Sequence, residues 1–169
     1  MGLFDKLTGT RHPTEGAPSA PADAVRTALL ALNRPDVPYT IRDTTEDAEL
    51  VAEWRLSEPA WQPLFVRSQL SRAVRISMRL DHEEQDVRAL EESWAVERIG
   101  NPPSLRVSSQ YTRGPARTVS THRKIQRGPD GRVEANAFFH FDSSELREPL
   151  RNTVLELGWT WRGVVFGKL

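Results

Sequence analysis

Residues 73–113 read AVRISMRLDHEEQDVRALEESWAVERIGNPPSLRVSSQYTR, and apolar side chains recur at alternate positions along much of this stretch. Alternation with a period of two is typical of strands that have one buried face. Turn-forming residues interrupt the pattern here, and do so twice more before residue 141. We therefore predict five consecutive strands, at 73–81, 86–99, 104–113, 117–127 and 132–141. Their connections are short enough to require antiparallel neighbours, so we expect a meander in sequence order.

Helical and strand patterns flank the meander on both sides. Before it we predict a helix at 22–33, strands near 39–42 and 48–56, and a short helix that Ser57 caps and Pro59 begins. After it we predict a helix at 144–157 and a closing strand at 159–166. The fold class is then α+β: an antiparallel meander sheet of five or more strands, with about three helices packed mainly on one face. We expect residues 21–169 to form a single globular domain.

Residues 1–20 are predicted to form a flexible N-terminal segment. Three prolines and two glycines lie within residues 9–22, a composition typical of a tether without regular structure. In front of the tether, Leu3, Phe4 and Leu7 have helical spacing. This short amphipathic piece is either a docking peptide for a partner or a membrane surface, or a frayed terminus. Seven residues are too few for a stable isolated helix, which favours the frayed terminus.

The composition excludes several classes of protein. The chain has no cysteine, so disulfides, thiolate catalysis and cysteine metal sites are ruled out. Lys plus Arg and Asp plus Glu number 23 each, so no overall charge attracts nucleic acid or an anionic membrane. No apolar run approaches the ~20 residues that span a bilayer. Asp5 and Lys6 interrupt the short apolar stretch of residues 1–7, which lacks a secretory pattern, so we expect no secretory signal. By elimination we expect a cytoplasmic protein.

Matching apolar side chains across neighbouring strands predicts the register of the sheet. A Pro-Asp-Gly turn at 129–131 places Phe139 and Phe141 opposite Thr121 and Val119. Extended outward, the same matching puts the even-numbered residues of strands 73–81 and 86–99 on one face with the odd-numbered residues of 104–113. We expect the helices to cover this face. The predicted core residues are Phe139, Phe141, Trp94 and Val107, whereas His122, Lys124 and Glu134 should lie on the other face.

Five polar residues stand out on the predicted apolar face: Glu92, Ser109, Tyr111, Thr121 and Arg123. The register places Glu92 across from Tyr111, and Ser109 across from Thr121. A buried Glu or Arg needs a partner, a water molecule or a ligand. These five residues are therefore our candidate ligand-binding site, with Arg123 as the anchor for an anionic group. The alternative is a Tyr111–Glu92 hydrogen bond inside a filled core, with Arg123 reaching out to solvent.

Two other groups of residues do not support a site. His122 and His140 are diagonal neighbours on the other face, but a metal ion needs a third ligand and Glu134 is ~13 Å away. The basic residues of 104–140 are more simply explained by pairing with the acidic strand 86–99. No aromatic-rich RNA-binding pattern accompanies them, which argues against a nucleic-acid partner. We predict no metal site and no cofactor.

Motifs for catalysis are also missing from the sequence. We find no serine nucleophile elbow, phosphate-binding loop, dinucleotide glycine pattern or zinc-protease motif. We therefore expect a non-enzymatic binding or adaptor domain of a bacterial protein, whose partner is an unknown protein or small ligand. The alternative is a pocket protein for an anionic or lipid-like ligand, or an enzyme, that uses the five polar residues. An enclosed cavity on the apolar sheet face would favour the alternative, and a filled core would favour the binding domain.

Overall fold

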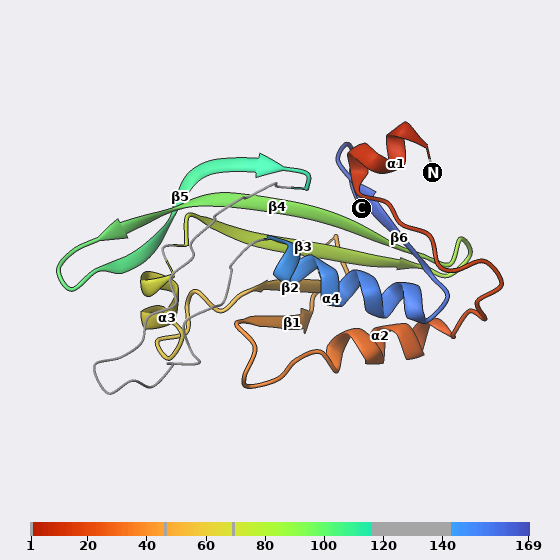
Figure 1. Ribbon diagram of the computed structural model, residues 1–169, viewed down its shortest axis with the longest axis horizontal. Coiled ribbons are helices and arrows are strands. Elements are labelled where there is room, and N and C mark those ends of the chain that lie inside the picture. The colour runs from red at the N-terminus through yellow and green to blue at the C-terminus, as the bar shows by residue number, and fades with distance from the viewer. Residues whose placement is uncertain (1, 46, 69, 116–142) are drawn as a thin grey trace, which may run out of the picture.

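A computed structural model describes residues 2–45, 47–68, 70–115 and 143–169 (Figure 1). These residues form four helices and one sheet of six strands. The helices are α1 (Leu3–Thr8), α2 (Ala22–Leu30), α3 (Gln62–Arg67) and α4 (Ser143–Glu156). The strands are β1 (Tyr39–Asp43), β2 (Leu50–Trp54), β3 (Arg72–Asp81), β4 (Asp86–Ile99), β5 (Ser104–Arg113) and β6 (Thr160–Val164). The predicted α+β class, with a C-terminal helix followed by a last strand, is confirmed.

The sheet is a meander with one parallel addition. Strands β1 to β5 lie in sequence order, and each pairs with the next in antiparallel fashion. Strand β6 then pairs in parallel with the first part of β4, residues 86–90, while β5 pairs with the second part, residues 92–99. The predicted meander is thus confirmed for residues 73–113. The predicted strands 117–127 and 132–141 lie outside the described residues.

Helices α2 and α4 pack against each other and cover one face of the sheet, which we call the covered face. The core between them is apolar and closely filled. The sheet contributes alternate residues of its strands, among them Leu50 and Ala52 of β2, Val74, Ile76, Met78 and Leu80 of β3, and Val87 and Ala89 of β4. The helices contribute their predicted stripes, Val25 and Leu29 of α2 and Leu146, Leu150 and Val154 of α4.

Two helix boundaries differ from prediction for local reasons. Helix α3 begins at Gln62 instead of near Ser57, and Pro63, not Pro59, is the proline of its first turn. Helix α2 ends at Leu30, before the predicted end at Asn33. The Asn33 amide instead donates to the Ile41 carbonyl (2.6 Å) and accepts from the Ile41 N–H (2.7 Å). It therefore occupies the outer edge of β1, where an unpaired strand edge would otherwise invite association.

The predicted face of β4 is wrong. In the structure Ile76 lies opposite Glu91 and Met78 opposite Ala89, so the odd-numbered residues of β4 share the covered face. Glu92 and Trp94 lie on the opposite face of the sheet, which we call the outer face. The sequence permitted the error because β4 carries apolar residues in both alternating sets, so its pattern alone does not say which set joins the buried residues of β3.

The predicted tether lies against the last strand at one end of the sheet. Residues 12–20 contain neither helix nor strand, but Arg11 pairs with Trp161 of β6. The Arg11 N–H donates to the Trp161 carbonyl (2.8 Å), and the Trp161 N–H donates to the Arg11 carbonyl (2.9 Å). Farther along, the Ala20 N–H donates to the Leu157 carbonyl (2.9 Å). The segment is thus attached at both ends, and its flexibility between these attachments stays a prediction.

Candidate functional site

Two of the predicted site residues meet on the outer face. The Tyr111 hydroxyl donates a hydrogen bond of 2.7 Å to Glu92 Oε2. The sequence predicted this contact from a register in which Glu92 lies directly across from Tyr111. In the structure β4 and β5 instead pair Glu92 with Arg113 and Trp94 with Tyr111. Tyr111 therefore reaches Glu92 diagonally. Ser109 is exposed on β5, and Thr121 and Arg123 lie outside the described residues.

A charged triplet crosses the strands beside this pair. Glu53 of β2 lies opposite Arg75 of β3, and its Oε2 accepts from Arg75 Nε at 3.2 Å. Its Oε1 accepts from Arg42 Nε of β1 at 3.4 Å. One carboxylate therefore bridges two guanidinium groups from the strands on either side. All three side chains are partly exposed, so these ion pairs contribute little to the stability of the fold. Their main effect is to hold the three side chains in position.

Arg75 links the charged triplet to an aromatic pair. Its guanidinium carbon lies 5.3 Å from the centroid of the Trp94 ring, a distance suited to cation–π attraction. The rings of Trp94 and Tyr111 are 5.6 Å apart and tilted by 48°. Contacts thus run without a break through Arg42, Glu53, Arg75, Trp94, Tyr111 and Glu92, which we call the outer-face row. Tyr111 is 49% exposed, so the row presents an aromatic surface that fixed polar neighbours hold in place.

A hollow of about 320 Å³ opens beside Trp94. Its walls are mostly apolar and include Trp54, Leu56, Ala73, Trp94 and Val107. Glu53, Arg75 and Ser57 supply its polar groups. Val107 is 46% exposed, so its prediction as a core residue is wrong, and Trp94 is only partly buried. The predicted core residues Phe139 and Phe141 lie outside the described residues, as do His122, Lys124 and Glu134.

A second hollow of about 280 Å³ lies on the same face and is richer in charge. Arg42, Arg75, Arg113 and Lys168 line it together with Asp47 and Glu92. The C-terminal residues form one side, where Arg113 Nη2 donates to the Gly167 carbonyl. The Nε atom of Arg113 is buried and finds no hydrogen-bond partner among the described residues. Cations therefore outnumber carboxylate side chains in this lining.

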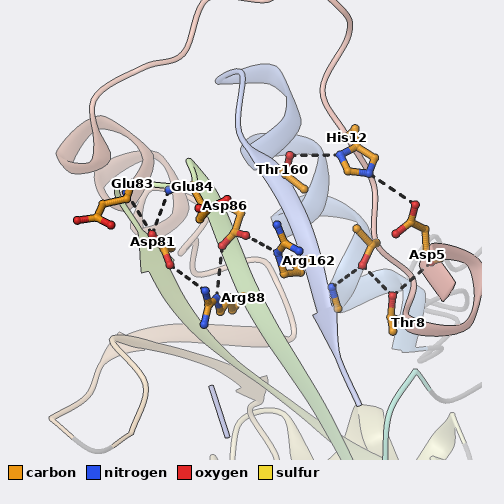
Figure 2. A network of polar contacts seen from close by, with 12 residues as sticks. Asp5, Thr8, His12, Asp81, Glu83, Glu84, Asp86, Arg88, Thr160 and Arg162 are labelled. Atoms are coloured by element: carbon orange, nitrogen blue, oxygen red, sulfur yellow. Dashed lines mark hydrogen bonds and ion pairs between the residues drawn. The ribbon is translucent and has the colours of Figure 1, made fainter. Parts of the chain in front are cut away.

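A third polar cluster lies where β3, β4 and β6 meet, and Figure 2 shows that its members hold one another. Asp86 is fully buried, with Arg162 and Arg88 as its ion-pair partners. Arg88 Nη2 also donates to Asp81 Oδ2 at 2.9 Å. The backbone N–H groups of Glu84 and Glu83 donate to Asp81, which lowers the pKa of that carboxyl. We interpret this cluster as a structural clamp on the turn from β3 to β4 and on β6.

Sequence reasoning missed Glu53 and Arg75 and misplaced Trp94. The polar alternation of β3, with Arg75, Ser77 and Arg79 between its apolar residues, was visible and indicated an outer face. To predict that Trp94 shares this face, one needs the register between β3 and β4. No local pattern in the sequence indicated that register.

Comparison with known proteins finds no match to a family model, a curated protein or a solved structure. Within the described ranges, no three His, Cys, Asp or Glu side chains gather closely enough to hold a metal ion. In the same part of the chain, no helix combines the length and apolarity needed to cross a bilayer. Function must therefore be argued from the residues of the chain itself.

The Tyr111–Glu92 contact makes a testable prediction about pH. The hydrogen bond to Glu92, with smaller contributions from burial and the carboxylate charge, raises the pKa of Tyr111 above its ordinary value. A raised pKa in the folded state means that the bond stabilises the fold below the ordinary tyrosine pKa. This stabilisation is lost as the pH rises through the raised pKa of Tyr111. We expect Glu92→Gln to lower the pKa of Tyr111 in an ultraviolet absorbance titration.

The other tyrosine of the chain is an internal control for this titration. Burial raises the pKa of Tyr39, whose ring packs on Trp54 in the core and does not contact Glu92. Its titration should therefore be the same in the Glu92→Gln variant. If neither tyrosine changes its titration in the variant, the outer-face contact does not exist in solution.

Proposed function

We propose that this chain is a non-enzymatic binding domain, and that its outer-face row and the hollow beside Trp94 recognise a protein partner. The observation that carries this proposal is the Trp94–Tyr111 pair, which is partly exposed and yet held on both sides. Arg75 lies against Trp94, and Glu92 accepts the Tyr111 hydroxyl. A partner would therefore meet a surface that is already ordered, which reduces the entropy cost of binding.

The residue types of this surface suit a protein partner. Trp, Tyr and Arg are the residues most enriched among those that dominate the binding energy of protein interfaces. The hollow gives the row a depression that an apolar side chain of a partner can fill, with Glu53 and Arg75 at hand for hydrogen bonds. Interfaces commonly combine such an apolar centre with a polar rim.

The covered face supports a binding domain more than a pocket protein. Leu50, Ile76, Met78, Leu146 and Leu150 are fully buried there between sheet and helices. A hollow beside Glu91 and Arg147 measures about 20 Å³, room for roughly one water molecule. In the outer-face row, each carboxylate already accepts a hydrogen bond from a neighbouring side chain, which suits recognition better than proton transfer.

The proposal is tested by affinity capture from an extract of cells that naturally contain the chain, followed by titration of the captured protein. We expect Trp94→Ala and Tyr111→Ala each to weaken binding about 30-fold or more, the loss of about 2 kcal/mol that defines a dominant interface residue. Phe166→Ala is the matched control, because Phe166 is also an exposed aromatic but lies outside the row. Equal binding by all variants, or an equal loss in the control, would overturn the proposal.

The charged hollow supports a second candidate, a site for a small anionic ligand. Four cationic side chains line it, and the unsatisfied Arg113 Nε has one N–H to donate to an oxygen of a carboxylate or phosphate. Citrate and inorganic phosphate should then raise the melting temperature of the wild type more than that of Arg113→Met. Equal shifts for both proteins, or equal shifts with sodium chloride of matched ionic strength, would exclude this candidate.

A further inference from the structure

Helix α1 presents its apolar side to solvent. Leu3, Phe4 and Leu7 are 76%, 68% and 66% exposed, whereas Thr8 is buried. At about 100° per residue the three apolar side chains occupy one sector of the helix. A surface helix normally turns such a sector toward the core. Here a polar residue faces the protein and the apolar residues face outward. Helix α1 lies beside β6, close to the N-terminus of the chain (Figure 1).

The segment after α1 fixes this orientation. Gly9 ends the helix in the left-handed conformation, with φ of 75°, and Thr10 Oγ1 accepts from the Gly163 N–H at 3.1 Å. Next to this bond the backbone of Thr8 crosses β6 at Gly163. A Cβ atom at position 163 would lie 1.7 Å from the Thr8 carbonyl oxygen, so only glycine permits the crossing. Helix α1 is therefore held to the sheet, unlike a free peptide of its length.

The charged residues of α1 are placed so that a cation, and not an anion, lies beside its apolar sector, which suits contact with an anionic surface. Asp5 lies on the side away from the apolar sector, accepts from the Gly2 N–H at 3.0 Å and is 3.7 Å from His12. Lys6 flanks the apolar sector, is exposed and makes no ion pair with another described residue. Lysine beside exposed Leu and Phe is the composition of helices that lie in the headgroup region of a membrane.

We propose that α1 docks this chain on the surface of an anionic lipid bilayer. Even if each of the three side chains offered the roughly 150–250 Å² of an aromatic residue, together they would fall short of the roughly 800 Å² per partner that a stable protein interface buries. The same shortfall disfavours a second copy of the chain. A bilayer needs no complementary groove, because apolar side chains insert between its lipids while a lysine reaches the phosphates. This inference uses another surface than the outer-face row and does not depend on it.

Vesicle flotation with the full chain tests the proposal. We expect the wild type to float with vesicles of phosphatidylcholine and phosphatidylglycerol, and more weakly with phosphatidylcholine alone. The double variant Phe4→Ser/Leu7→Ser should lose flotation with both. Lys6→Gln should lower the affinity for the anionic vesicles about fivefold and leave binding to phosphatidylcholine unchanged. Ile99→Ser is the control, since Ile99 is 42% exposed on the hairpin of β4 and β5 and should have no effect.

A second arm tests the attachment of α1. Gly163→Ala should displace Thr8 and weaken flotation although α1 itself is unchanged, and circular dichroism should show that the sheet persists. Thr10→Val, which removes the acceptor for Gly163, should weaken flotation in the same direction. The proposal is overturned if the wild type does not float, or if Phe4→Ser/Leu7→Ser floats as well as the wild type. It is also overturned if sedimentation shows a dimer that this double variant abolishes while vesicles bind neither form.

Discussion

Replacing Arg147 with methionine should lower the free energy of unfolding by about 3–5 kcal/mol, the usual cost of removing one partner of a buried ion pair. Glu91 is buried on the covered face, where Arg147 of α4 grips it with two hydrogen bonds. Nε donates to Oε2 at 2.8 Å, and Nη2 donates to Oε1 at 3.0 Å. The variant would leave the Glu91 carboxylate in the core without the two N–H groups that Arg147 donates to it.

Urea denaturation of three variants separates this pair from an ordinary surface pair. Arg151→Met on the same helix breaks a contact of 3.8 Å with the exposed Glu148, so it should cost less than about 1 kcal/mol. The double variant Glu91→Leu/Arg147→Met should recover much of the lost stability, because neither charge of this pair is then left buried without the other. A cost below about 1 kcal/mol for Arg147→Met would contradict the burial of Glu91.

Truncating Phe65 to alanine should also cost about 3–5 kcal/mol. Phe65 of α3 is fully buried in the core cluster, where its ring lies 6.5 Å from that of Trp61. Its removal would leave a cavity that the surrounding sheet and helix can fill only in part. The loss should appear as a lower denaturation midpoint with an unchanged denaturant slope.

Phe166 is the matched control for this truncation. It is the same residue type but is 82% exposed, so Phe166→Ala should change stability by no more than about 0.5 kcal/mol. Similar costs for Phe65→Ala and Phe166→Ala would show that helix α3 is not packed as the structure has it.

Most of the fold could be predicted because its signals are local. The alternation of Val74, Ile76, Met78 and Leu80 predicts β3 and its covered face, and all four are buried. The stripe of Leu146, Leu150 and Val154 predicts α4 and the side it buries. Both patterns repeat within a single element, so no knowledge of its neighbours was needed.

The face of β4 could not be predicted, because a distant residue helps to decide it. Glu91 and Glu92 are adjacent and chemically alike, and only one of them can face the core. Glu91 does so because Arg147, 56 residues along the chain, lies above it on α4. Trp94 consequently lies on the outer face with Glu92, although its own chemistry favours burial. The Tyr111–Glu92 contact expected from the sequence is present, but on the opposite side of the sheet from the one predicted. Ligand binding by the five candidate residues stays a prediction.

The orientation of α1 had a similar long-range cause. Leu3, Phe4 and Leu7 predict an amphipathic helix, but their spacing cannot say which way it turns. The contact of Thr8 with Gly163 sets the direction, and it joins residues at opposite ends of the sequence.

Site-specific photo-crosslinking tests most directly the claim that the outer-face row and its hollow bind a partner. A photoreactive phenylalanine analogue would replace Val107, which lines the hollow, in cells that naturally contain the chain. The same analogue at Asn152, exposed on α4, would be the control on the other side of the molecule. We predict one crosslinked partner from position 107, lost when Trp94→Ala is added, and none from position 152. No product from position 107, or the same product from both positions, would contradict the assignment of the outer face as the recognition surface.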